Sequence, residues 1–217
     1  MIPLHVRASL TGALSLPDGY IHLDALLAAA VVLRDEIPPA HTAEEIVPVE
    51  IPVAREPGGC FHLASAAVAL WEKMETRYTQ RRFPVTEAAV RSAMKSINLS
   101  AGRQKNYRIP MEAGHVEGDR LDWWCVGEPG EIRSLLDLVT HVGRKRSAGL
   151  GRVREWVVDE CEPWEDFPVL GRDAEALRHL PLDWPGLGEH LVRWGRVSYP
   201  YWLRADLAEV AAPLAAL

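Results

Sequence analysis

A glycine-rich basic loop at residues 143–153 holds the residue types that suit contact with a phosphate chain. Glycines let a ligand approach the backbone closely, and arginine and lysine offer charge to phosphodiesters. The candidate contact residues in this loop are Arg144, Lys145, Arg146, Ser147, Gly149, Gly151 and Arg152. We expect the loop to bind nucleic acid, although a solvated turn that carries charge would have a similar sequence.

The elements on either side of the loop argue against two common nucleotide-binding motifs. Apolar residues recur at helical spacing over 131–142, and Gly143 is expected to cap that helix with a positive φ. Branched and aromatic residues over 153–158 predict a strand. A P-loop runs instead from strand to helix and ends in Gly-Lys-Ser/Thr. The dinucleotide fingerprint also fails, because Arg154 stands where its third glycine should be.

Positive charge is concentrated in two segments of a chain whose net charge is −6. Residues 77–108 hold eight Lys or Arg and one acid, and residues 143–154 hold five bases and no acid. The remainder of the 217 residues carries −18. Such segregation directs a polyanion to a limited surface and repels it elsewhere.

The first of these segments suits single-stranded RNA. Arginine and lysine follow the phosphates of a strand, while an aromatic ring stacks on a base. The candidate contacts are Arg81, Arg82, Lys95, Arg103, Lys105, Tyr107 and Arg108. We expect a helix over 86–97 and a long basic loop over 98–110, for which a solvated excursion is the alternative.

Metal-independent RNA cleavage is the competing function. It needs a general base near the attacking 2′-hydroxyl and a cation for the developing phosphorane. The candidates are His5, His22, His62, Lys105 and Tyr107. They form no recognisable cluster in the sequence, so we expect no catalytic site. Cys60 and His62 lack a second pair of ligands, and we expect neither a metal nor a cofactor.

The remaining patterns predict an α+β domain followed by an irregular extension. Alternation over 4–10 predicts a half-buried strand, and Asp24 is placed to cap a helix that ends near Arg34. Segment 47–53 resembles an edge strand, and 121–126 a buried one. We expect one domain over 1–158, with a basic insertion near 77–108. Residues 159–217 form a tryptophan-rich extension with little regular structure, packed on the body or on a partner.

The compartment follows from three cysteines and from the hydropathy pattern. The cysteines are scattered and include no CxxC pair, which favours buried thiols in a reducing compartment. No signal peptide or membrane-spanning apolar run is recognisable. We therefore expect a cytoplasmic protein.

Five short motifs together resemble the small RAMP-superfamily subunit of type IV CRISPR effector complexes. They are IHLDALLA at 21–28, FHLASA at 61–66, RRFP at 81–84, GLGRVREW at 149–156 and PYW at 200–202. The motifs run from about residue 20 to residue 202 and so span most of the chain. A glycine-rich loop between the last helix and the last strand occurs throughout the RAMP superfamily, so the combination of motifs is more specific than this loop alone.

The resemblance implies a modified ferredoxin-like (RRM-like) fold and a structural role in a hetero-oligomeric ribonucleoprotein of antiviral defence. Such a subunit binds guide RNA, caps the 5′ handle of the crRNA, and contacts the backbone RAMP subunit and the large subunit. Residues 144–147, Gly149 and Gly151 would approach the RNA, with Arg81 and Arg82 as a second contact. Because related scaffolds also carry catalysis, an endoribonuclease that processes precursor crRNA stays the alternative.

Overall fold

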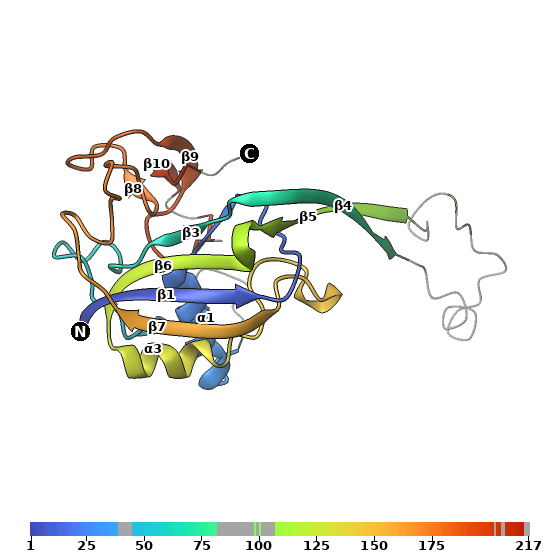
Figure 1. Cartoon of the computed structure of the whole chain (residues 1–217), viewed down its shortest axis with the longest axis horizontal. Helices are drawn as coiled ribbons and strands as arrows, with labels where there is room; N and C mark the ends of the chain where they lie inside the picture. The colour runs from blue at the N-terminus through green and yellow to red at the C-terminus, as the bar shows by residue number, and fades with distance from the viewer. Residues whose placement is uncertain are drawn as a thin grey trace.

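The computed structural model describes residues 1–38, 45–81, 98, 100, 107–201, 203–204 and 207–214. At the centre of the body, strand β1 (Ile2–Leu10) lies between β6 (Arg120–Gly127) and β7 (Val153–Glu160), antiparallel to both (Figure 1). The apolar residues of the alternating pattern in β1 are at most 1% exposed. The strands predicted over 4–10, 121–126 and 153–158 are therefore confirmed, and the mixture of helices and antiparallel sheets agrees with the α+β class.

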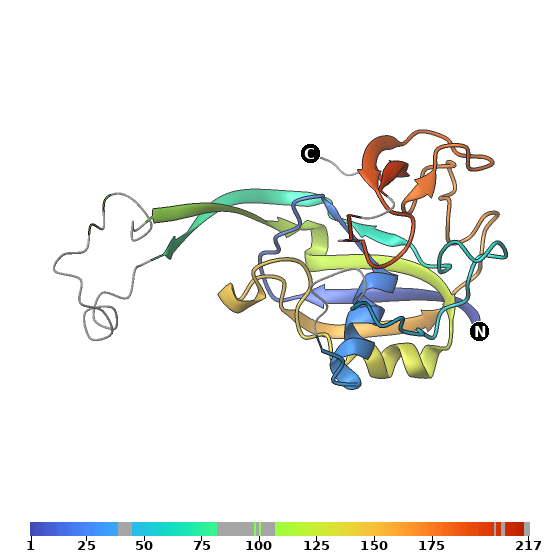
Figure 2. The same ribbon diagram turned by 180° about the vertical axis from the view of Figure 1, so that it is seen from behind.

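Two helices, α1 (Leu23–Arg34) and α3 (Pro129–Leu136), cover one face of this sheet (Figures 1 and 2). Helix α3 ends six residues earlier than the pattern predicted. Although Val142 is fully buried as a helical face would require, its amide donates to the carbonyl of Gly151, 2.8 Å away. The chain over 140–142 thus pairs with the far side of the glycine-rich loop, and Gly143 is not a helix cap.

The segment that follows α1 lies along the free side of β6. Strand β3 (Ala66–Val68) pairs with the short β2 (Tyr20–His22), and just before it Ala64 forms a bridge with Cys125 of β6. Segment 47–53 forms only one isolated bridge, from Val53 to Gly127, so the predicted edge strand is wrong. Pro48 and Pro52 lack the amides that a ladder needs.

A two-stranded arm extends away from the body (Figures 1 and 2). It consists of β4 (Trp71–Arg81) and β5 (Tyr107–Val116), and a short turn, η2 (Glu117–Asp119), connects β5 to β6. Part of the predicted basic loop is therefore strand, because residues 107–110 pair with the end of β4. The helix predicted over 86–97 lies outside the described residues.

The C-terminal extension contains a small sheet of its own, which the sequence did not predict. Strands β8 (Leu180–Pro181), β10 (Ala208–Ala212) and β9 (Leu191–Gly195) pair in that order. Pro181 is tolerated because β8 is an edge strand of this sheet. Phe61 of the body is fully buried among the apolar residues of the extension. The division of the chain after residue 158 stays a prediction. In the described parts of the chain, no helix is long and apolar enough to cross a membrane.

Candidate nucleic-acid interface

The glycine-rich loop is closed at its base like a hairpin. His141 bridges to Arg152, and the amide of Val153 donates to the carbonyl of Thr140 at 2.9 Å. The tip is a single 3₁₀ turn, η3 (Arg146–Ala148), between two residues in the left-handed region, Lys145 at φ 59° and Gly149 at φ 78°. The continuous exposed part of the loop is residues 144–149, and Arg152 at its base is exposed as well.

Backbone hydrogen bonds hold this loop against the segment that follows β1. The amide of Arg144 donates to the carbonyl of Ser15 at 2.9 Å, and the amide of Gly151 donates to the carbonyl of Ala13 at 2.8 Å. Both ends of the exposed segment are thus fixed to the body. Little conformational entropy remains to be lost at these backbone positions when a ligand binds.

The three glycines of the loop differ in the space that surrounds them. A Cβ at Gly143 would lie 2.6 Å from the carbonyl oxygen of Ser15, and a Cβ at Gly151 would overlap the carbonyl oxygen of Val142. Both positions also have positive φ. By contrast, a Cβ at Gly149 would meet no atom within 4 Å. Gly143 and Gly151 are required by packing, whereas Gly149 leaves its backbone open to a ligand.

The charged side chains of the loop are free to meet an anion. Arg144, Lys145, Arg146 and Arg152 are exposed, as is Ser147. None of these four cations forms an ion pair with a carboxylate of the described residues. Their charge is therefore not neutralised within the described part of the chain.

The loop and the base of the arm form one structural unit. Leu150 is 1% exposed and packs in a small apolar cluster with Ala13 and with Met111 and Ala113 of β5. A cavity of about 430 Å³ lies between loop and arm. Its lining residues are Ser15, Pro17, Thr76, Pro110, Met111, Glu112, Arg144 and Lys145. Two loop cations and the arm thus face a common space.

The arm presents aromatic rings beside positive charge. The guanidinium carbon of Arg108 lies 4.7 Å from the centre of the Tyr78 ring, and Tyr78 and Tyr107 are 55% and 40% exposed. Arg81, the last residue of β4, is opposite Tyr107 in the register. Exposed rings of this kind can stack on unpaired bases. Arg82, Lys95, Arg103 and Lys105 lie outside the described residues, and their contacts stay predictions.

A family model described as CRISPR type IV associated protein Csf3 matches residues 60–213. The chain belongs to the Csf3 family. The matched range contains the arm, the glycine-rich loop, β6 and β7, and nearly all of the C-terminal extension that the structure describes. Membership of a type IV CRISPR family, which the sequence motifs indicated, is therefore confirmed. A search of curated proteins gave no match.

In this Csf3-family chain a buried polar cluster joins α1 to the C-terminal extension, and the sequence did not predict it. Arg178 is 0% exposed and donates to the carbonyls of His62 and Ala64, the latter at 2.9 Å. A second nitrogen of its guanidinium lies 3.4 Å from the carboxylate of Asp24, which is also 0% exposed. The hydroxyl of Tyr201 donates to the same carboxylate at 2.9 Å.

The position of Asp24 corrects its predicted role. His22 precedes α1, and Asp24 lies within the first turn, so Asp24 is not the cap of the helix. Its carboxylate is instead the acceptor of the buried cluster. One signal for this cluster was present in the sequence, since Asp24 is the single carboxylate in the otherwise apolar run LDALLAAA. A charge buried there without a partner would be costly, so a partner was to be expected.

Two of the candidate general bases, His22 and His62, lie beside the buried cluster of Asp24 and Arg178, and His5 lies apart from them on the sheet. His22 and His62 are 6% and 8% exposed, and His5 donates a 2.7 Å hydrogen bond to the carboxylate of Asp122 on the sheet. Burial lowers the pKa of His22 well below its usual value, and it also lowers the pKa of His62. Lys105 lies outside the described part. No group of three His, Cys, Asp or Glu among the described residues could hold a metal.

We expect the folded protein to lose stability as the pH falls from about 7 to about 5. Burial lowers the pKa of His22, His62 and His179, so below about pH 6.5 the unfolded chain binds protons that the folded chain does not. His22→Phe keeps the ring stacked on Tyr201, 4.1 Å away, and removes two buried ring nitrogens that have no partner among the described residues. Urea unfolding at several pH values should give a slope smaller by up to about 1.4 kcal/mol per pH unit in this variant.

The matched control for this experiment is Leu33→Phe, which adds a ring at an exposed position of α1 and changes no titratable group. This variant should retain the wild-type dependence on pH. If His22→Phe also retained it, burial of a neutral His22 would be excluded as a source of the acid sensitivity.

Proposed function

We propose that this protein is a non-catalytic, guide-RNA-binding subunit of a type IV CRISPR ribonucleoprotein, and that it caps the 5′ handle of the crRNA. The observation that carries the proposal is the set of exposed loop cations, Arg144, Lys145 and Arg146, held by backbone hydrogen bonds beside the arm. The Csf3 family match supports the type IV part of the proposal.

The geometry favours a single strand over a free nucleotide. Consecutive cations on a fixed loop can neutralise successive phosphates, and the open backbone at Gly149 permits close approach. Tyr78 and Arg108 offer a ring and a guanidinium a short way along the arm. A strand that crossed from loop to arm would therefore meet phosphate contacts first and stacking surfaces next.

We further propose that the body is a RAMP-type modified ferredoxin-like fold. Its support is the order of elements around the central sheet, in which β1, α1 and β3 are followed by β6, α3 and β7. This is the β-α-β-β-α-β order of ferredoxin-like folds. The glycine-rich loop lies between the last helix and the last strand of the second half, as it does in the RAMP superfamily.

Within such a complex, the protein would contact the backbone RAMP subunit and the large subunit in addition to RNA. The absence of catalysis is part of the proposal. Cleavage of precursor crRNA by His22 or His62 would require an RNA strand to reach histidines that are at most 8% exposed. An endoribonuclease therefore stays the alternative outcome of the experiment below.

The test replaces Arg144, Lys145 and Arg146 together with alanine. Each phosphate contact to a single strand contributes about −0.7 to the slope of log affinity against log salt, so the slope should become shallower by about 2. The affinity for labelled repeat-derived RNA should fall by about 10-fold to 100-fold near 100 mM salt. Fluorescence anisotropy between 50 and 200 mM salt measures both quantities.

The control removes three exposed arginines of the helix and the extension: Arg34, Arg172 and Arg204. This variant has the same net charge as the first one, so a specific role of the loop predicts a nearly unchanged slope in the control. Equal slopes in the wild type and in the loop variant would refute the RNA-backbone contact. Gel analysis of the same samples should show intact RNA, and a product cut at one position would favour the endoribonuclease.

A further inference from the structure

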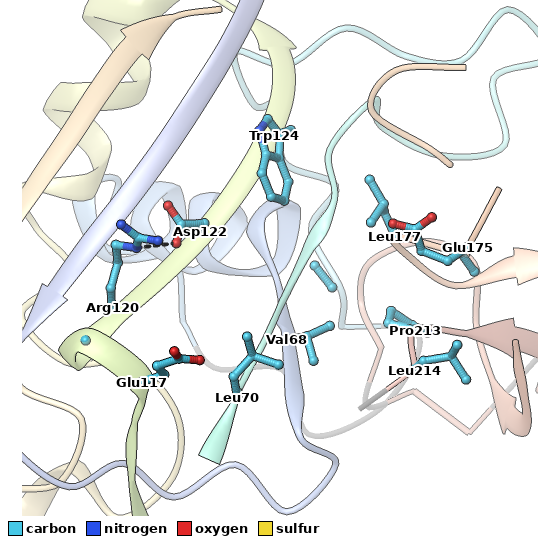
Figure 3. A pocket seen from close by; sticks show the side chains of 13 residues that line it. Val68, Leu70, Glu117, Arg120, Asp122, Trp124, Glu175, Leu177, Pro213 and Leu214 are labelled. Carbon is cyan, nitrogen blue, oxygen red and sulfur yellow. Dashed lines mark ion pairs between the residues drawn. The ribbon is translucent and has the colours of Figure 1, made fainter. Parts of the chain in front are cut away.

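A groove opens where β3 diverges from β6, on the far side of the sheet from the helices (Figure 3). At one end, the amide of Ser65 donates to the carbonyl of Trp124 at 2.8 Å, and at the other the amide of Glu117 donates to the carbonyl of Leu70 at 2.8 Å. Between these two links lies a cavity of about 550 Å³. The C-terminal extension forms its third side, through 175–177 and 213–214.

The walls of the groove are largely apolar. Val68 and Leu70 project from the β3 side, Trp124 from β6, and Leu177 and Leu214 from the extension (Figure 3). Leu70 and Leu214 are 55% and 40% exposed. A partner that covers these converging apolar side chains would remove them from water, and this burial is favourable.

The polar groups of the groove are mostly acidic. Arg120 is its one lining cation among the described residues, and the Nε of Arg120 lies 2.8 Å from the carboxylate of Asp122. Glu117 and Glu175 also line the groove, and neither forms an ion pair with a cation of the described residues. The carboxylate of Glu175 accepts a backbone hydrogen bond in its own turn, from the amide of Asp173 at 3.0 Å.

The negative charge of the groove disfavours RNA and favours a basic segment of a protein. Two uncompensated carboxylates repel the phosphates of RNA, whereas the exposed cations of the glycine-rich loop attract them. A lysine or arginine on a protein partner would find both a counter-charge and an apolar wall for its stem. The groove and the loop therefore differ in the chemistry that each can bind.

We infer that this groove binds a short segment of a protein partner that carries leucine-sized side chains and at least one lysine or arginine. The walls at 66–70, which begin with β3, and at 120–124 in β6 give the groove an elongated lining, which suits a segment in extended conformation. The inference rests on the proposed place of this chain in a complex with other protein subunits, but it does not depend on RNA binding by the loop. The acidic, apolar groove would thus bind protein, whereas the basic loop would bind RNA.

Site-specific photo-crosslinking tests the occupant of the groove. A benzoylphenylalanine in place of Leu70 is introduced into the full chain, which is co-expressed with the other protein subunits of its complex and irradiated. We expect a crosslink to one protein subunit, at a peptide with apolar and basic residues, identified by mass spectrometry. The matched control position is Leu33 on α1, which is 62% exposed and should not crosslink to that peptide. Crosslinks to RNA alone, to a second copy of this chain, or to nothing would overturn the inference.

A charge variant provides an independent measurement. Glu117→Lys combined with Glu175→Gln reverses one carboxylate and neutralises the other, and the amide oxygen of the new glutamine can still accept the bond from Asp173. The amount of the crosslinked subunit that co-purifies at fixed concentration should fall by about tenfold or more, because like charges that meet in an interface weaken it. Bound guide RNA per chain should not change, which separates this result from a failure of RNA binding. The control variant is Glu160→Lys with Glu209→Gln, both exposed elsewhere. Equal recovery in the two variants would contradict the inference.

Discussion

Replacing Arg178 with methionine lowers the free energy of unfolding by about 3 to 5 kcal/mol, the largest effect that we expect from a single side chain. The guanidinium is 0% exposed and donates to five groups besides Asp24. They are the carbonyls of His62, Ala64, His179 and Val197 and the hydroxyl of Tyr201. Methionine fills similar volume, so the loss comes from unpaired polar groups and from the isolated carboxylate of Asp24. Urea denaturation at pH 7 measures it.

A double-mutant cycle shows whether the buried charge is the cause. Asp24→Asn in the Arg178→Met background removes the isolated carboxylate and should recover part of the loss, giving a coupling energy of at least about 1 kcal/mol. Arg172→Met, an exposed change six residues earlier, should alter stability by less than about 0.5 kcal/mol. Strict additivity of the Asp24 and Arg178 variants would show that the pair does not interact in the folded protein.

This cluster also explains why the C-terminal extension could not be predicted from the sequence. Arg178 and Tyr201 belong to the extension, yet their partners Asp24, His62 and Ala64 lie more than a hundred residues earlier. Prolines such as Pro181 favoured an irregular tail. An edge strand accepts proline, however, and non-local hydrogen bonds and packing on Phe61 order the chain around it.

Apolar patterns predicted an element correctly where a single periodicity ran through the whole of it. In β1 the residues that alternate as apolar are the ones that face the helices, and the same holds for Leu121 and Trp123 in β6. The pattern over 131–142 failed at its end for an instructive reason. Val142 is apolar and buried, but it is buried by pairing with Gly151 and not by continuing α3. Helical spacing and a buried bridge residue give the same sequence signal there.

The candidate interface was predictable in its residue types but not in its geometry. Charge and glycine content predicted contact residues from Arg144 to Arg152, and the structure exposes 144–149 and Arg152 but buries Gly151. The contact of Leu150 with Met111 and Ala113, which joins the loop to the arm, depends on side chains some forty residues apart. The apolar pattern within the loop or within β5 alone does not predict a contact between them. Nor could the sequence distinguish Gly149 from Gly151, whose surroundings differ completely.

That difference leads to the second large effect. We expect Gly151→Ala to lower the free energy of unfolding by about 3 kcal/mol or more. Alanine at φ 66° is strained by about 1 to 2 kcal/mol, and relief of the overlap with the Val142 carbonyl requires a backbone shift that costs a similar amount. The amide of Val142 donates to the carbonyl of Gly151 at 2.8 Å, so the same shift weakens the base of the loop.

Gly149→Ala is the matched comparison, because φ is 78° there but no atom lies within 4 Å of the added Cβ. Its stability loss should be about 1 to 2 kcal/mol, from backbone strain alone. Thermal unfolding ranks the two variants, and RNA titration at a temperature where both are folded separates packing from contact. If Gly149 is where the RNA backbone approaches most closely, Gly149→Ala weakens RNA binding more than its stability loss accounts for. An unaltered affinity in Gly149→Ala would instead confine the RNA contact of the loop to its charged side chains.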